Sequence, residues 1–292
     1  MTVTETEVKN ILTRTTGFLK TVTSHSVQPY RGCSYGNSLC GVGCYVQHNF
    51  WITKGRPWGS FLEVRTNAAD AYYASVARER RWAERRESGE FGIYMSSSTD
   101  PFVPQEGRYG ITRSLLGAMV DEPPDTLIIQ THSHRVVDEI DRLFTLSERC
   151  SLRVHFSIET DREDVPGLPP HASSVENRFK AAKLLRDTGI HVVVTVSPLL
   201  PIANPETFFE RIAGCADAVV IDHFVKGDGS RDGHRTMQTP LPEVIRVLDE
   251  RALSLDYRDR MAELAERVMP GRVGVHIDGF AGRMGGGGIS DQ

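Results

Sequence analysis

The chain has 292 residues, of which 39% are hydrophobic and 25% charged, and its formal net charge is −4. This size suits one large α/β domain or two small ones, and the slightly acidic balance argues against a dedicated duplex-DNA binder. No stretch reaches the roughly 18 apolar residues that cross a bilayer, and residues 1–10 are polar, without an apolar signal region. We therefore expect a cytoplasmic protein without a membrane partner.

Strand-like and helix-like segments alternate along most of the chain, with the period of about 30 residues that is typical of βαβ units. The expected strands are 19–27, 91–97, 126–133, 152–160, 191–200 and 217–224. The expected helices are 68–86, 107–122, 135–149, 174–189 and 205–216. Most of the strands are continuous apolar runs, as in parallel strands that are covered on both faces. The pattern predicts an α/β fold, a partial (β/α)6 barrel that is TIM-like but open.

The segments after the last repeat are of another kind. Residues 241–269 form a long helical pattern, a short strand-like segment follows at 272–278, and residues 282–292 are Gly-rich. We predict a barrel domain at 1–225, a helical C-terminal extension with a short strand at 226–281, and a disordered tail at 282–292.

Polar residues follow most of the expected strands. In parallel α/β folds, ligands bind at the carboxyl ends of the strands. We therefore expect a site where these residues meet: Ser96, Ser97, Ser98, Thr99, Asp100, Thr131, His132, Ser133, His134, Ser157, Glu159, Asp161, Asp222, His223 and Lys226.

Three of the five cysteines, Cys33, Cys40 and Cys44, lie within twelve residues on a Gly-rich loop. An odd number of cysteines, in a chain without a secretion signal, argues against a disulfide framework. Three thiolates can hold a [4Fe–4S] cluster and leave one iron open. An open iron can chelate S-adenosylmethionine, and one-electron reduction then cleaves the sulfonium to a 5′-deoxyadenosyl radical. Cys150 and Cys215 stand alone and are expected to be buried apolar residues.

Two other metal sites are compatible with the residues. The three cysteines could hold zinc with His25 or His48 as the fourth ligand. Alternatively, the strand-end residues could gather a divalent ion for a barrel hydrolase, with ligands from His132, His134, Asp222 and His223.

The sequence resembles the radical S-adenosylmethionine superfamily, and most closely its spore photoproduct lyase-like branch. The resemblance covers about residues 27–225 and is carried by PYRGCSYG, by Cys44 followed directly by Tyr45, and by SSSTDPFVPQEGRYGITR at 96–113. It continues in IIQTHS, VHFSIET and VVVTVSPLLPIANPE. It implies a partial (β/α)6 barrel, a [4Fe–4S] cluster, S-adenosylmethionine, and an external electron donor such as flavodoxin or ferredoxin.

The resemblance also implies roles for particular residues. Tyr45 would lie beside the adenine, Ser97 and Ser98 would contact the methionine moiety, and Ser157 would hold the ribose or the carboxylate region. Asp100 and Glu106 would line the site. His132 stands where this branch usually has a Lys, and a neutral imidazole would hold the cofactor carboxylate less firmly than an ammonium.

Two departures from the family pattern affect the prediction. The usual spacing is CxxxCxxC, whereas six residues separate Cys33 from Cys40 and three separate Cys40 from Cys44. A set of Cys40, Cys44 and Gln47 is therefore an alternative to the three cysteines. The lyase also carries a hydrogen-donating cysteine after the second strand, where this chain has only serines, at 96–98. Thymine-dimer repair is therefore not expected.

The predicted function is a radical S-adenosylmethionine enzyme, of lyase or oxidoreductase type, that abstracts hydrogen from a small molecule or metabolite. One alternative keeps this chemistry but acts on a nucleic acid or nucleotide, and would show steeply salt-dependent binding. Another alternative is a cluster-binding protein without catalysis.

Overall fold

The computed structural model describes residues 1–285. Its main sheet has eight strands in the order β11-β10-β9-β8-β7-β6-β3-β2. All neighbouring pairs are parallel except β2 with β3. The sheet does not close on itself, so the predicted α/β partial barrel is confirmed. The bounds are β2 (Leu12–Arg14), β3 (His25–Val27), β6 (Gly92–Met95), β7 (Thr126–Thr131), β8 (Ser151–Ser157), β9 (Val192–Val196), β10 (Ala218–Ile221) and β11 (Val273–Val275).

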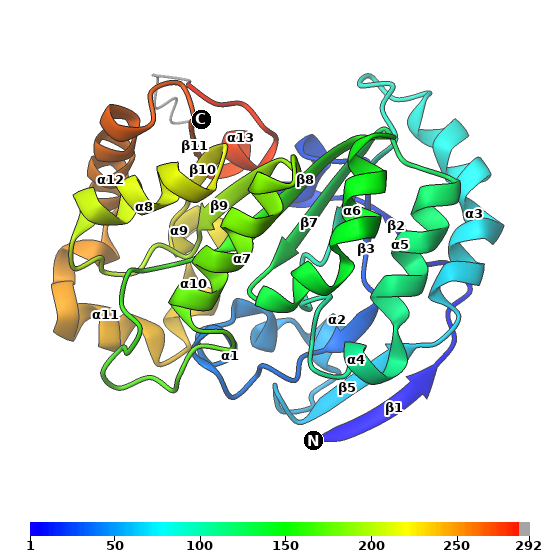
Figure 1. Cartoon of the computed structure of the whole chain (residues 1–292). Helices are drawn as coiled ribbons and strands as arrows, with labels where there is room; N and C mark the ends of the chain where they lie inside the picture. Colours follow the sequence, from blue (N-terminus) through cyan, green and yellow to red (C-terminus); the bar gives the residue numbers. More distant parts are fainter. Residues whose placement is uncertain (286–292) are drawn as a thin grey trace.

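Helices cover one face of this sheet. Figure 1 shows α3, α5, α6, α7 and α8 side by side in front of the strands. Their bounds are α3 (Ala68–Ala83), α5 (Ile111–Asp121), α6 (Ile140–Ser147), α7 (Val175–Asp187) and α8 (Pro205–Cys215). Leu152, Val154 and Phe156 of β8 belong to the large core beneath the helices. Successive side chains of a strand point to opposite faces of the sheet. The side chains on the helix-covered face are apolar, because burying apolar surface stabilises the fold.

The opposite, concave face has its own smaller core. Tyr94 and Val193 belong to it, together with residues from η1 (Gly17–Thr21) and α13 (His276–Phe280). The rings of Phe18 and Phe280 pack edge to face, with 5.7 Å between their centroids. Side chains of this smaller core therefore occupy part of the concave face, between the strands, η1 and α13.

Several expected helices are interrupted. Residues 107–122 form α4 (Glu106–Tyr109) and α5, because Gly110 between them adopts a φ of 60°. The segment 135–149 begins as a 3-10 turn, η3 (His134–Glu139), before α6. The stretch 241–269 consists of α11 (Leu241–Asp249), η4 (Glu250–Leu253) and α12 (Leu255–Val268), separated where Asp249 and Ser254 turn extended.

A second, three-stranded sheet was not predicted. It joins β1 (Thr2–Thr6) in parallel and β4 (Tyr30–Gly32) in antiparallel fashion to β5 (Phe61–Arg65). The residues of β1 are mostly exposed, so no apolar pattern marks this strand in the sequence. The small sheet matters for the site, because β4 ends directly before Cys33.

The C-terminal segment returns to the main sheet. The strand-like segment expected at 272–278 contains β11, which pairs in parallel with β10. Two short helices, α9 (Phe224–Gly227) and α10 (His234–Met237), lead from β10 to α11. Of the predicted disordered tail, residues 286–292 lie outside the described residues. In the part of the chain from 1 to 285, no helix is both long and apolar enough to span a membrane.

A buried carboxylate links α3 to the edge of the main sheet and makes stability depend on pH. Glu79 accepts from Arg14 Nε at 2.8 Å and Arg78 Nε at 2.8 Å, and lies 3.2 Å from His25 Nε2. Burial alone would raise the pKa of Glu79, but these partners hold it at about 2, below its ordinary 4.5. The ionised form therefore stabilises the fold above pH 4.5, and this contribution is lost as the pH falls toward 2.

We expect Glu79→Gln to lower the free energy of unfolding at pH 7 by about 2–3 kcal/mol. The difference from the unmodified chain should shrink in acid, because below pH 4.5 the carboxylate of the unfolded chain is protonated and has to lose that proton on folding. Urea denaturation at pH 7 and near pH 3 measures both values. An equal difference at the two pH values would show that Glu79 acts through packing and not through its charge.

Candidate functional site

The cysteine loop lies against the carboxyl ends of the parallel strands. Cys33 follows β4, Cys40 lies in α1 (Leu39–Val42), and Cys44 precedes η2 (Tyr45–His48). The Tyr35 hydroxyl is 3.0 Å from the Phe102 carbonyl and 3.2 Å from Ser133 Oγ. Phe102 follows β6 and Ser133 follows β7, so the loop is held at the rim where ligands of such folds bind.

Close backbone packing shapes this loop. A Cβ on Gly41 would lie 2.0 Å from the Tyr35 carbonyl oxygen, and one on Gly36 would lie 2.2 Å from Gly59 Cα. Any side chain at these two positions would therefore displace the backbone. The glycines between the cysteines therefore allow a tight turn in the loop that carries the three thiols.

The three thiols influence one another electrostatically; Cys33 is buried, and Cys40 and Cys44 are half-buried. Burial raises the pKa of Cys33 and of Cys44 to about 12, and raises that of Cys40 further. Each thiol also raises the pKa of another, Cys44 that of Cys33, Cys33 that of Cys40, and Cys40 that of Cys44. Cationic iron would offset this mutual repulsion of thiolates. Three soft thiols on one tight loop fit an iron–sulfur cluster.

A zinc site receives no comparable support. Among residues 1–285, no three His, Cys, Asp or Glu side chains converge closely enough to hold one metal ion. Thiolates on one zinc ion lie about 2.3 Å from it and so contact one another. The thiols of a [4Fe–4S] cluster bind separate irons and stand further apart. Of the two proposed fourth ligands, His25 is engaged with Glu79 and Ser24, whereas His48 Nε2 has no hydrogen-bond partner among residues 1–285.

The divalent-ion alternative receives no support either, because its four residues point to separate partners. His132 pairs with Glu159, His134 with Ser173 Oγ at 2.6 Å, His223 with the Ala252 carbonyl at 3.0 Å, and Asp222 with His276 at 3.0 Å.

Asp100 interacts with the first cysteine of the loop, and its contact with a cofactor stays a prediction. Its carboxylate accepts from the backbone N–H of Phe102 at 2.9 Å and of His132 at 2.7 Å, and from the Thr131 hydroxyl at 3.0 Å. Burial raises the pKa of Asp100, and Asp100 raises the pKa of Cys33. These bonds tie the loop after β6 to the end of β7, so Asp100 positions the rim.

A buried ion pair sits behind His132; Glu159 was predicted as a strand-end residue, but its partner Arg178 was not. Glu159 Oε2 is 2.8 Å from Arg178 Nη1, and Glu159 Oε1 is 2.7 Å from His132 Nε2. Glu159 and Arg178 are 2% and 1% exposed. Burial alone would raise the pKa of Glu159, but Arg178 and His132 hold it below its ordinary value. A charged residue on the apolar side of α7, between Val175 and Ala182, was the signal that could have found Arg178.

Ser157 lies inside the barrel. Its Oγ accepts from Gln130 Nε2 at 2.6 Å, and the same amide donates to Thr195 Oγ1 at 2.8 Å. The Tyr94 hydroxyl donates to Gln130 Oε1 at 2.7 Å. Ser157 is fully buried in this network. Its contact with a cofactor stays a prediction.

Tyr45 begins η2, directly after Cys44. Burial, together with the neighbouring Cys44, raises its pKa to about 12. Tyr45 in turn raises the pKa of Tyr94 on the concave face. The residue is therefore close both to a predicted cluster ligand and to the lumen, where the adenine contact is predicted.

The serines after β6 differ in their surroundings. Ser96 has a φ of 75° and is buried, and its hydroxyl has no partner within the described chain. Ser97 Oγ accepts from Gln28 Nε2 at 2.9 Å, and Ser98 lies at the rim beside it. A non-glycine residue in the left-handed region costs about 1–3 kcal/mol, which is typical of functional sites.

Glu106 serves the start of α5. It accepts from the Tyr30 hydroxyl. It also accepts from the backbone N–H groups of Thr112 and Arg113, in both cases at 3.0 Å. These bonds satisfy N–H groups that the first turn of a helix leaves open. The carboxylate is thus engaged with the protein itself.

His276 was missed by the sequence analysis. It directly follows β11, has a φ of 52°, and its Nδ1 lies 3.0 Å from Asp222 Oδ1. Asp222 directly follows β10, so both residues stand at the carboxyl ends of neighbouring strands. Only after β11 has joined the main sheet do these two residues meet.

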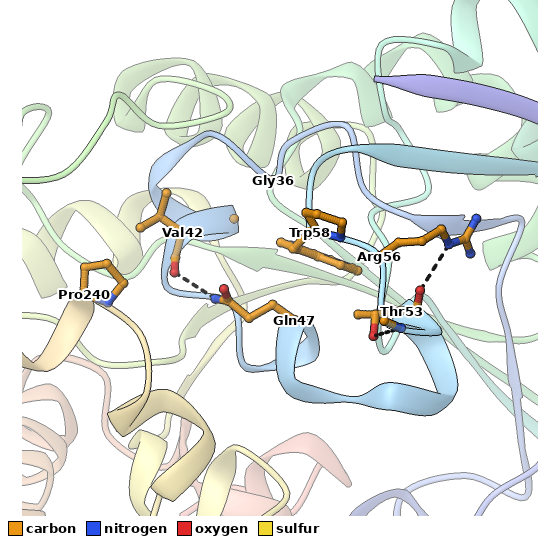
Figure 2. A pocket seen from close by; sticks show the side chains of 10 residues that line it. Gly36, Val42, Gln47, Thr53, Arg56, Trp58 and Pro240 are labelled. Atoms are coloured by element: carbon orange, nitrogen blue, oxygen red, sulfur yellow. Dashed lines mark hydrogen bonds between the residues drawn. The ribbon is translucent and has the colours of Figure 1, made fainter.

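Two hollows flank α2 (Phe50–Thr53), the helix after the cysteine loop. The first, of about 520 Å³, reaches the backbone of the loop at Gly36 and Gly41, and Figure 2 shows Trp58, Arg56 and Gln47 around it. In Figure 2, Gln47 points to the Val42 carbonyl, to which its Nε2 donates at 3.0 Å. The second, of about 410 Å³, lies beside Ser97 and Ser98.

No protein-family model matches the chain. An uncharacterized protein of Methanocaldococcus jannaschii is 27% identical over 176 residues, which are 60% of each chain. An uncharacterized protein of Mycobacterium tuberculosis is 25% identical over 183 residues, which are 61% of this chain and 50% of that protein. The chain thus spans half to three fifths of the length of these curated relatives.

Solved structures define the fold class as an open, partial barrel of parallel strands. One spore photoproduct lyase mutant, solved with dinucleoside spore photoproduct, matches with a TM-score of 0.61 and 18% identity over 94% of this chain and 80% of that one. Another, with bound AdoMet and dinucleoside spore photoproduct, matches with a TM-score of 0.57 and 19% identity over 87% and 76%. The chain has the fold of spore photoproduct lyase, as the sequence resemblance implied.

Proposed function

We propose that this chain is a radical S-adenosylmethionine enzyme. The observation that supports the proposal is that the glycine-rich loop carrying Cys33, Cys40 and Cys44 is held by Tyr35 at the carboxyl ends of the parallel strands. When bound there, a [4Fe–4S] cluster supplies the electron that cleaves S-adenosylmethionine to a 5′-deoxyadenosyl radical. The AdoMet bound to a solved protein of the same fold supports this assignment.

The residues around the loop would hold S-adenosylmethionine in distinct ways. Tyr45 would lie beside the adenine, Ser97 and Ser98 would meet the methionine moiety, and Ser157 the ribose or carboxylate region. Asp100 supports these contacts by fixing the rim through its three hydrogen bonds. His132 would act less strongly, because Glu159 already occupies its Nε2 at 2.7 Å.

The substrate is proposed to be a small molecule or metabolite, and the protein is proposed to be cytoplasmic. An external flavodoxin or ferredoxin would supply electrons. Ser96 argues against thymine-dimer repair, because a serine O–H bond is too strong to donate a hydrogen atom readily to a carbon radical. A nucleotide substrate is the second candidate, because the solved proteins of this fold carry a dinucleoside photoproduct.

Anaerobic reconstitution with iron and sulfide tests the proposal. We expect a brown protein with four irons and four acid-labile sulfides per chain, which forms 5′-deoxyadenosine from S-adenosylmethionine when dithionite is added. Deuterium transfer from labelled extract compounds into 5′-deoxyadenosine would identify the substrate. A colourless protein that gains neither iron nor sulfide would refute the proposal. A brown protein without 5′-deoxyadenosine would be a cluster carrier.

A further inference from the structure

The hollow beside Ser97 and Ser98 has an unusual charge balance. Three of its eleven lining residues are cationic, Arg31, Lys54 and Arg65, and none carries a carboxylate. The remaining lining residues include the hydroxyls of serines and a threonine, which can donate hydrogen bonds. A volume of about 410 Å³ suits a small molecule.

The cations of this hollow lack sufficient counter-charge. Neither Lys54 nor Arg65 has a carboxylate partner in residues 1–285, and Arg65 Nη1 donates only to the Gln28 carbonyl, at 2.8 Å. Arg31 lies 3.4 Å from Glu63, but Glu63 is shared with Arg56 at 2.6 Å. Burial and the nearby Arg31 lower the pKa of Arg65, and Glu63 offsets only part of this effect. Like charges held together inside a concave surface create a potential that attracts anions.

One of the three cations, Lys54, extends from the end of α2. Lys54 ends α2 with a φ of 52°, a conformation that side chains rarely adopt. Its Nζ lies 5.0 Å from the centre of the Trp51 ring, which is 79% exposed. Arg31 Nε in turn donates to the Ile52 carbonyl at 2.9 Å, so it fixes the helix that carries Trp51. A ligand at this end of the hollow would therefore meet both the Lys54 ammonium and the Trp51 ring.

The other end of the hollow opens on the predicted cofactor site. Ser97 and Ser98 follow β6 at the rim, whereas Ser26 and Thr13 come from β3 and β2. Within the described part of the chain, the hydroxyls of Ser26, Ser98 and Thr13 make no hydrogen bond. A ligand held at the cationic end could therefore reach along these hydroxyls to the rim.

We propose that this hollow binds the phosphate group of a small phosphate monoester, whose other end lies at the rim beside Ser97 and Ser98. Three cations match the dianionic monoester better than the single charge of a phosphodiester. A hollow of about 410 Å³ also suits a small ester better than a nucleic-acid backbone, which needs an extended basic groove. The assignment of this ester as the substrate rests on the proposed function, whereas phosphate binding does not.

Calorimetric titration of the full chain without cluster tests the proposal. The probes are adenosine 5′-monophosphate, ribose 5-phosphate, adenosine without phosphate, a dinucleoside monophosphate and a single-stranded oligonucleotide. We expect saturable binding of the two monoesters and none of adenosine. Arg65→Gln should weaken monoester binding by about tenfold or more, since hydrogen bonds to charged groups are the strong ones. Lys54→Gln is an exposed second variant in case Arg65→Gln fails to fold.

Arg81→Gln, on an exposed position of α3, removes the same charge elsewhere and should leave binding unchanged. Equal binding of adenosine, no binding of either monoester, or a preference for the diester or the oligonucleotide would overturn the proposal. Failure of the radical chemistry is separate, because it would appear as missing 5′-deoxyadenosine while the cluster-free chain still binds the monoesters.

Discussion

Alanine in place of Cys33, Cys40 or Cys44 is expected to leave the reconstituted protein colourless or nearly so. Loss of a residue that only supports a metal ligand already costs about 10–100-fold in affinity. Loss of one of three thiolate ligands should therefore lower iron retention and 5′-deoxyadenosine formation by at least about 100-fold. Iron and acid-labile sulfide per chain measure the cluster content directly, independently of catalytic activity.

Cys150→Ala and Cys215→Ala are matched controls, because both thiols lie outside the loop and make only hydrogen bonds to backbone carbonyls. They should keep the colour and the iron. Gln47→Ala distinguishes the alternative ligand set, in which Gln47 replaces Cys33. The structure gives Gln47 another role, since its Nε2 donates to the carbonyls of Val42 at 3.0 Å and Cys44 at 2.9 Å. Full iron in Cys33→Ala with loss in Gln47→Ala would favour the alternative set.

Arg178→Met is expected to destabilise the fold strongly. It leaves the carboxylate of Glu159 buried and paired only with His132. Removing one member of a buried ion pair costs about 3–5 kcal/mol, because the remaining charge is no longer compensated. Urea denaturation at pH 7 measures this loss as a lower free energy of unfolding.

Two further variants show whether charge is the cause. Arg211→Met breaks an exposed pair with Glu176 and should cost no more than about 1 kcal/mol. Arg178→Met combined with Glu159→Leu removes both charges, and should recover much of the stability. If the double variant is as unstable as Arg178→Met alone, the loss comes from packing around α7 and not from an unpaired carboxylate.

The pattern of residues predicted the elements that are regular along the chain. Apolar runs such as 191–200 and 126–133 marked strands that are buried on both faces, and their spacing predicted parallel pairing. The three cysteines were predicted from residue chemistry, because several thiols placed close together in a glycine-rich segment are typical of a metal or cluster site. The helix predicted at 107–122 is divided in two, because Gly110 adopts a left-handed backbone conformation.

The small sheet and the polar partners were not predictable in the same way. The strand β1 has an exposed, polar sequence and forms only because the edge of β5 offers unpaired backbone groups. Arg178 and Glu159 are 19 residues apart, and His276 lies 54 residues beyond Asp222. Such pairs depend on how the strands are ordered in the sheet.

The amino-acid order alone specified the parallel barrel and the thiol-bearing loop, because local periodicity and residue chemistry carry both. The folded arrangement established which polar groups meet: Glu159 with Arg178, Asp222 with His276, and Arg31, Lys54 and Arg65 around one hollow. The reason is physical. Burial and secondary-structure preference act between near neighbours in the chain, whereas charge pairing and hydrogen bonding at a rim depend on distances that exist only once the strands have paired.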